Sequence, residues 1–248
     1  MTKNFSLSCI IPVFNEGKRL EKTFEALRQF QCDANTLEVI FVNDGSTDAT
    51  EEMLSDFLKT YPQGRLVTYT SNRGKGYAVT LGMQRATGDY RLFFDADMST
   101  PISEFKKFMP VLEEGVDVVI GTRKTGDALL LERQPWLRET MGKVFTAMSN
   151  HLIGSTISDF TCGFKCFSRK SAAVIFATTR IERWAYDVEI LLYARLNGFT
   201  IAEVPVVWKN DKNTSVRLFK DTVRSFIDLV RIRVFGKKWA RTARSSII

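Results

Sequence analysis

The chain has 248 residues, enough for one large domain, and its 44% hydrophobic content excludes disordered, collagen-like and coiled-coil architectures. The formal net charge is +7, but residues 1–208 hold 24 Lys and Arg against 25 Asp and Glu, whereas residues 209–248 hold 11 against 3. The positive excess therefore belongs to the C-terminal segment. Because the rest of the chain is balanced, we expect no nucleic-acid partner.

Cysteine usage and hydropathy bear on the compartment. The chain has four Cys and one His, too few ligands around Cys162 and Cys166 for a zinc site. It does not begin with a basic segment followed by a short apolar run, so we expect reduced thiols and a cytoplasmic location. Since no apolar run reaches 18 residues, any membrane contact is expected to be peripheral.

Strands and helices alternate through the first half of the sequence. Short apolar runs predict strands at residues 7–14, 37–43, 65–70, 90–96 and 116–121. Apolar residues at helical spacing predict helices at residues 17–30, 50–61, 76–86 and 101–115. This alternation is typical of an α/β fold with a mainly parallel, doubly wound sheet, in which ligands bind at the carboxyl ends of the strands.

After Gly121 the alternation breaks. We predict a helix at 135–153 that acts as a lid or interface element, a helix at 181–198, a strand at 199–208 and a last helix at about 216–235. The first of these helices carries an apolar stripe of Trp136, Leu137, Met141, Val144, Phe145, Met148 and Leu152. We expect one domain over residues 1–212, with two halves that meet near residue 121, and a C-terminal appendage over residues 213–248.

Two aspartates, Asp95 and Asp97, directly follow the predicted fourth strand. Alternate residues at a strand end point the same way, and two such carboxylates suit Mg²⁺ or Mn²⁺ bridging to phosphates. The same pattern also caps ordinary loops. The position at the expected ligand edge favours the metal site.

Polar residues also follow the first two strands. The segment 12–16 lacks the G-x-G-x-x-G of dinucleotide-binding sheets, which argues against NAD and FAD. Asn15 and Glu16 would either bind a base or ribose or cap the next helix. After the second strand, Asp44 is a further acceptor for a base or ribose, and Gly45 permits a tight turn.

A basic, glycine-rich turn over residues 72–76 precedes the third helix. Gly74 and Gly76 allow the backbone to approach a ligand, and Arg73 and Lys75 supply cations for a diphosphate. Together with the D-x-D pair on a neighbouring strand, this turn predicts a site for a nucleoside diphosphate and a divalent metal ion.

The motifs IIPVFNEG, VNDGSTDAT, NRGKGYA and DAD resemble those of family 2 glycosyltransferases, which have a GT-A fold. The segments SDFTCGFKCFSRKSAAVIF, ERWAYDVEIL and IAEVPVVW resemble the dolichyl-phosphate β-glucosyltransferase branch of polyprenyl-phosphate hexosyltransferases more than the mannose synthase branch. Two positions depart from the usual patterns. Asn43 stands where the family usually has Asp, and Ser99 stands where mannose synthases often have a Gln metal ligand, which favours the glucosyl branch.

The resemblance implies a role for each matching residue. The pocket for base and ribose would consist of Pro12, Phe14, Glu16 and Asp44, with Lys75 near the nucleotide. Asp95 and Asp97 would hold the metal and the diphosphate, and Asp97 would count among the catalytic residues. Arg123 and Arg133 would bind the acceptor phosphate.

These roles predict inverting transfer of a hexose, glucose from UDP-glucose, to a polyprenyl or dolichyl phosphate. A lipid phosphate is already an anion, so it needs no general base, and the protein positions it and neutralises charge. A sugar hydroxyl as acceptor would need a base, for which Asp187 or Glu189 is the candidate. The sequence also allows GDP-mannose as the donor, or a nucleotide-sugar-binding protein without activity.

The last predicted helix is amphipathic. On a helical wheel one arc consists of Val216, Phe219, Val223, Phe226, Ile227 and Val230, and the opposite side carries Arg217, Lys220, Arg224 and Arg231. Such a helix lies on an anionic membrane surface, unless it docks on the domain with its charged face in solvent. We expect a peripheral protein on the cytosolic face of a membrane. Nothing in the sequence indicates its oligomeric state.

Overall fold

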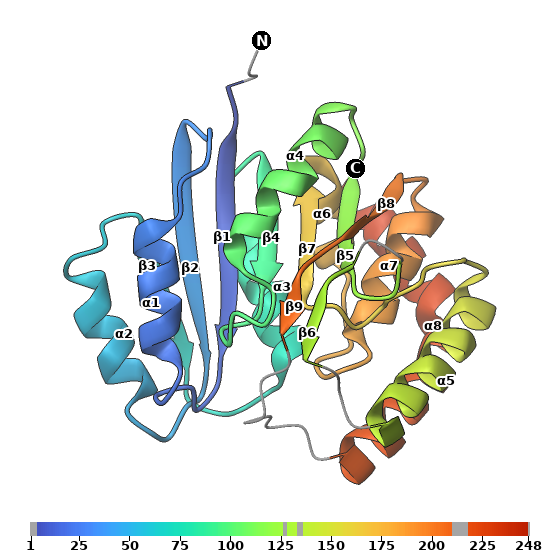
Figure 1. Ribbon diagram of the computed structural model, residues 1–248. Helices are drawn as coiled ribbons and strands as arrows, with labels where there is room; N and C mark the ends of the chain where they lie inside the picture. The colour runs from blue at the N-terminus through green and yellow to red at the C-terminus, as the bar shows by residue number, and fades with distance from the viewer. Residues whose placement is uncertain (1–3, 126–127, 133–135, 210–217, 248) are drawn as a thin grey trace.

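The computed structural model describes residues 4–125, 128–132, 136–209 and 218–247 (Figure 1). The strands are β1 (Ser6–Val13), β2 (Thr36–Asp44), β3 (Gly64–Tyr69), β4 (Tyr90–Phe94), β5 (Val118–Thr122), β6 (Leu130–Glu132), β7 (Phe164–Ser168), β8 (Ile201–Pro205) and β9 (Trp208–Lys209). The helices are α1 (Leu20–Gln29), α2 (Thr50–Leu58), α3 (Lys75–Arg85), α4 (Phe105–Glu113), α5 (Trp136–Ile153), α6 (Arg169–Phe176), α7 (Tyr186–Leu196) and α8 (Leu218–Ile247), with a short 3-10 turn at Ile102–Glu104.

Seven strands form one sheet in the order β3-β2-β1-β4-β7-β5-β8, and β6 pairs with β9 in a small second sheet. Neighbours in the large sheet are parallel except for β7, which is antiparallel to both β4 and β5. The predicted α/β class with a mainly parallel, doubly wound sheet is therefore confirmed.

Helices cover both faces of the sheet (Figure 1). Consecutive residues of a strand point to opposite faces, so Ile10 belongs to the core cluster that includes α3 and α7, whereas Cys9 and Ile11 belong to the cluster that includes α1, α2 and α4. This burial on both faces explains why the central strands are continuous apolar runs.

The predicted elements of the first half are confirmed, with shifts of a few residues at their ends. The sequence-based assignment missed β7 and α6, because residues 158–176 carried no predicted element. The helix predicted at 181–198 begins only at Tyr186, and the strand predicted at 199–208 is split into β8 and β9. The predicted domain boundary at residue 212 lies outside the described residues.

The carboxyl ends of the parallel strands meet at the lower edge of the sheet in Figure 1. Because β7 runs the opposite way, its amino end lies at this same edge. Residues 158–163, which lead into β7, therefore lie at this edge as well. The candidate site residues of both halves are thereby brought to one edge.

Helix α8 is docked on the domain. It packs against α7 and α5, with Leu229, Ile232 and Ala240 buried. In the described part of the chain, no helix combines the length and hydropathy that crossing a bilayer requires.

Candidate active site

Asp95 and Asp97 stand in a tight turn directly after β4. The Met98 N–H donates to the Asp95 carbonyl at 3.2 Å, and the Ser99 N–H donates to Asp97 Oδ1 at 2.8 Å. Met98 has a φ of 53°, which closes the turn. Burial and the neighbouring Asp95 raise the pKa of Asp97. The two carboxylates therefore repel each other at the ligand edge of the sheet, and a cation would relieve this repulsion.

Lys75, the first residue of α3, forms an ion pair with Asp95 Oδ1. Burial disfavours the charged ammonium, but Asp95 and Asp187 outweigh burial and raise the pKa of Lys75. Lys75 is therefore a cation at the D-x-D pair, and its predicted role beside the nucleotide stays a prediction.

Glu16 follows β1 and accepts two hydrogen bonds from Arg19, from Nε at 2.5 Å and from Nη2 at 2.6 Å. Burial raises the pKa of Glu16 to about 7, and Asp97 and Asp95 add to this shift against the opposing effect of Arg19. Glu16 thus lies within electrostatic reach of the D-x-D pair. Phe14, at the same strand end, is exposed, and Pro12 is partly buried.

Asp44, at the end of β2, orders the turn that leads into α3. Its carboxylate accepts hydrogen bonds from Arg73 N–H at 2.7 Å, Gly74 N–H at 2.8 Å and Asn72 Nδ2 at 2.9 Å. Asp44 is buried, so its place in a base or ribose pocket stays a prediction.

Gly74 and Gly76 meet a neighbouring backbone segment. A Cβ at Gly74 would lie 2.7 Å from the Glu182 carbonyl oxygen, and one at Gly76 would lie 2.6 Å from the Ile181 carbonyl oxygen. These contacts account for both glycines, which the sequence analysis had assigned to a ligand.

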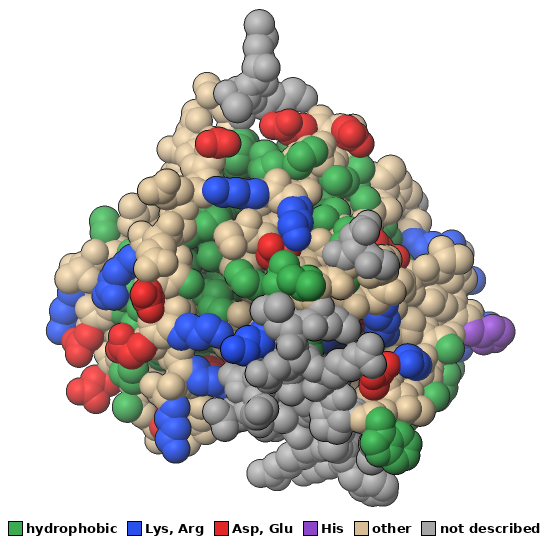
Figure 2. All heavy atoms as spheres, viewed as in Figure 1, with side chains coloured by type: hydrophobic (Ala, Val, Ile, Leu, Met, Phe, Trp, Pro, Cys, Tyr) green, Lys and Arg blue, Asp and Glu red, His purple; other side chains and the backbone are tan. Residues whose placement is uncertain are grey.

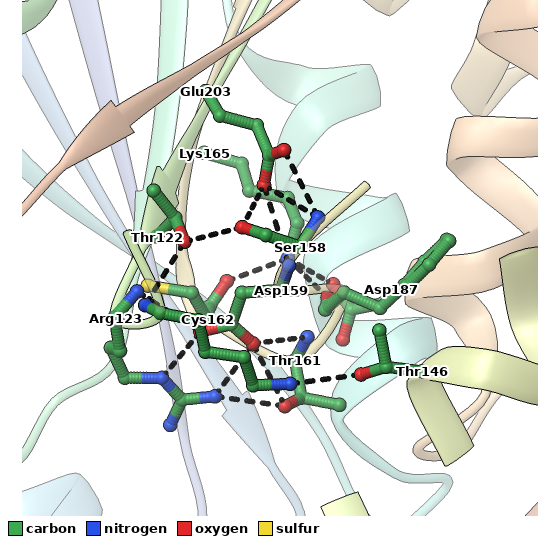
Figure 3. Close-up of polar contacts among 12 residues, drawn as sticks. Thr122, Arg123, Thr146, Ser158, Asp159, Thr161, Cys162, Lys165, Asp187 and Glu203 are labelled. Carbon is green, nitrogen blue, oxygen red and sulfur yellow. Dashed lines mark hydrogen bonds and ion pairs between the residues drawn. The ribbon is translucent and has the colours of Figure 1, made fainter. Parts of the chain in front are cut away.

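Arg123, directly after β5, points toward Asp159 (Figure 3). Its Nε donates to Asp159 Oδ2 at 2.7 Å, and its Nη2 donates to Asp159 Oδ1 at 2.8 Å and to Thr161 Oγ1 at 2.9 Å. Asp159 is 0% exposed. Burial alone would raise the pKa of Asp159, but Arg123 outweighs it and holds this pKa well below its usual range. The predicted acceptor-side cation is thus part of a buried ion pair.

The segment before β7 is tied to β5 and to β8 (Figure 3). Glu203 on β8 accepts hydrogen bonds from Ser158 N–H at 3.0 Å and Ser158 Oγ at 2.6 Å, and Ser158 Oγ lies 2.6 Å from Thr122 Oγ1. Sequence reasoning missed Ser158, Asp159 and Glu203. Their one signal was the polar pair Ser158-Asp159 just before an apolar run. Arg133 lies outside the described residues.

Comparison with known proteins identifies the family. The model of the family described as "Glycosyl transferase family 2" matches residues 8–176, more than half of the chain. The chain belongs to this family. The predicted resemblance and enzyme class are therefore confirmed.

Two curated relatives of this family 2 glycosyltransferase are dolichyl-phosphate beta-glucosyltransferases. The protein from Dictyostelium discoideum is 33% identical over 243 residues, which cover 93% of this chain and 74% of the relative. The protein from Homo sapiens is 32% identical over 246 residues, which cover 92% and 75%.

A solved structure shares the fold of this glycosyltransferase. Glucosyl-3-phosphoglycerate synthase from Mycobacterium tuberculosis, in complex with Mn²⁺, UDP and glucosyl-3-phosphoglycerate, matches with a TM-score of 0.68 at 18% identity. The match covers 92% of this chain and 80% of the synthase. It supports the predicted GT-A fold.

The D-x-D pair is the candidate metal site of the glycosyltransferase. Within the described ranges, no group of three or more His, Cys, Asp or Glu residues is arranged to hold a metal ion. His151 is exposed at the side of the molecule (Figure 2). Mg²⁺ is commonly held by one or two protein carboxylates plus substrate phosphates, so Asp95 and Asp97 fit an ion that binds together with a diphosphate.

Proposed function

We propose that this glycosyltransferase transfers glucose from UDP-glucose, with inversion, to a polyprenyl or dolichyl phosphate. The observation that carries the proposal is the similarity to dolichyl-phosphate beta-glucosyltransferases over 93% of the chain. The D-x-D pair with Lys75 at the carboxyl edge of the sheet supports it, because a nucleotide diphosphate needs cationic partners there.

On the donor side, Asp95 and Asp97 would hold Mg²⁺ or Mn²⁺ against the diphosphate. Such an ion supplies charge neutralisation of the leaving diphosphate. Lys75 contributes a second positive charge beside Asp95, and Phe14 and Glu16 face the nucleoside from the end of β1.

On the acceptor side, the surroundings of Asp187 favour a phosphate over a hydroxyl. Asp187 is buried, and its Oδ1 already accepts a hydrogen bond from Lys165 at 2.6 Å. A buried carboxylate that is held by a lysine is poorly accessible to a hydroxyl acceptor, whereas a lipid phosphate needs no base. Arg123 binds Asp159 and Thr161 through Nε and Nη2. Its Nη1 is the group proposed to donate hydrogen bonds to the acceptor phosphate. Arg133 is proposed as a second cation.

Donor choice is the direct test of this function. The purified protein is incubated with Mg²⁺, polyprenyl phosphate and labelled UDP-glucose, UDP-GlcNAc or GDP-mannose. We expect lipid-extractable label from UDP-glucose at a rate at least about tenfold above that from either other donor. A site that hydrogen-bonds one substrate rejects an analogue that leaves its polar groups unpaired. Unphosphorylated polyprenol is the matched control and should give none. Preferred use of GDP-mannose would contradict the donor, and equal use of polyprenol would contradict the acceptor.

We propose further that α8 holds the protein on the cytosolic face of an anionic membrane. Opposite its docked face, an exposed apolar stripe consists of Val223, Ile227, Val230 and Val234. Exposed cations on this helix are Arg224, Arg231, Arg233, Lys237 and Lys238. The acid Asp228 is buried and paired with Arg231 at 3.3 Å. Apolar side chains among cations match the interface of an anionic bilayer.

The stripe refines the predicted wheel. Val223, Ile227 and Val230 belong to the predicted arc and are exposed, whereas Phe226 of the same arc is partly buried against the core. The helix therefore docks through one apolar side and presents a second one. On the neighbouring α5, Val144 and Met148 are also exposed, whereas Phe145 and Leu152 pack against the core.

Vesicle binding separates the two contributions. Replacing Arg224, Arg233 and Lys237 by Gln should weaken binding to anionic vesicles on the order of 100-fold at low salt, since each cation contributes about 1 kcal/mol. Replacing Ile227, Val230 and Val234 by Ser should remove the part of vesicle binding that persists at high salt. The matched control is Lys106→Gln on α4. Unchanged binding in both variants, or a dimer that the Ser substitutions abolish, would contradict the membrane assignment.

A further inference from the structure

Lys165 is a lysine on a central strand that no part of the reaction outlined above uses. It lies on β7 between β4 and β5, in register with Phe93 and Ile120, and it is 0% exposed. A charged group there is costly, and such buried ion pairs are often replaceable by apolar residues without loss of stability. The position of this ammonium therefore calls for an explanation other than stability.

The three protons of the Lys165 ammonium are all used. Nζ donates to the carbonyl oxygens of Phe160 at 2.9 Å and Cys162 at 2.6 Å, and to Asp187 Oδ1 at 2.6 Å. It thus ties the segment before β7 to the first turn of α7 (Figure 3).

The backbone segment and the carboxylate that Lys165 binds are both linked to Asp95. The segment that contains Phe160 and Cys162 also contains Gly163, where an added Cβ would collide with Asp95 Oδ2. The Asp95 carboxylate therefore rests directly on this backbone. Asp187, on the other side, acts electrostatically on Lys75, the ion-pair partner of Asp95.

We propose that Lys165 is a positioning residue that fixes the Asp95 carboxylate for the metal–diphosphate complex through the backbone of residues 160–163. The proposal rests on the proposed function for the identity of the ligand. It concerns the placement of one carboxylate, which is measurable without turnover.

The test compares Lys165→Met with the double variant Lys165→Met/Asp187→Asn. In the single variant, Asp187 is left as an uncompensated buried charge, so both stability and binding should fall. The double variant removes that charge and should regain thermal stability, but the carbonyls of Phe160 and Cys162 remain released. We therefore expect its Kd for UDP with Mn²⁺, measured by calorimetry, to stay at least about tenfold above that of the wild type. Lys170→Met, at an exposed lysine of α6, is the matched control.

A purely structural role would let stability and affinity recover together, so wild-type affinity in the double variant would overturn the proposal. The second readout is a crystal structure of the double variant. We expect the Asp95 carboxylate to be displaced from Gly163, and an unchanged position would overturn the inference even if the donor proved to be another nucleotide. Mn²⁺-dependent UDP binding without glucose transfer would contradict the proposed function and leave this inference intact.

Discussion

Replacing Asp97 by Asn is expected to lower the rate of glucose transfer by at least about a thousandfold while leaving the fold as stable as that of the wild type. The substitution removes one of the two carboxylates proposed to hold the metal, so charge on the leaving diphosphate would no longer be neutralised. The pKa of Asp97 is raised in the folded protein, so above the pKa of the unfolded chain its ionised form opposes folding. Stability at pH 7 should therefore be retained or slightly increased. The transfer assay and thermal unfolding measure the two effects.

The matched control is Asp33→Asn, a change at an exposed aspartate, which should alter neither quantity. Removal of divalent ions by EDTA should abolish transfer by the wild type, and added Mg²⁺ or Mn²⁺ should restore it. Full activity in EDTA would show that the D-x-D pair does not work through a metal.

Replacing Arg123 by Ala is expected to lower the free energy of unfolding by about 3–5 kcal/mol, because it leaves Asp159 as a buried, unpaired charge. From the sequence alone, Arg123 was expected to act only on the acceptor phosphate. The ion pair adds a structural role. Urea unfolding at pH 7 measures the loss. Arg169→Ala, which breaks an exposed pair with Asp89, should cost less than about 1 kcal/mol, and an equal loss in both variants would contradict the assignment.

The same ion pair predicts a pH dependence. The pKa of Asp159 is depressed in the folded protein, so the pair contributes stability above the pKa of about 3.9 in the unfolded chain and loses it as the pH falls further. In Arg123→Ala this acid-dependent loss should disappear. The double variant Arg123→Ala/Asp159→Asn should recover part of the stability. If this double variant is stable but does not transfer glucose, Arg123 also acts on the acceptor.

The part of the site that could be predicted depends on local signals. Asp95 and Asp97 follow an apolar strand, and in a parallel sheet this alone places them at the ligand edge. The pairs Arg123–Asp159 and Lys165–Asp187 join residues 36 and 22 positions apart, so only the tertiary structure reveals them. Lys165 even interrupts the apolar pattern by which β7 would have been found.

The C-terminal helix shows a second limit. Its amphipathic character was evident, but the side that docks could not be deduced, because Leu229 and Ile232 are as apolar as Ile227 and Val230. Which of two apolar sides is buried depends on the shape of the surface formed by α5 and α7.

The antiparallel strand β7 determines the order in which this protein can fold. Strand β5 belongs to the first half of the chain, yet its two neighbours, β7 and β8, both come later in the sequence. A nascent chain that ends near residue 121 therefore holds β5 without any strand partner. Only after residues 164–168 leave the ribosome can β5 join the sheet through β7, and such long-range pairing is slow. Residues 1–121 thus do not complete the sheet on their own, because β5 pairs only with strands of the second half.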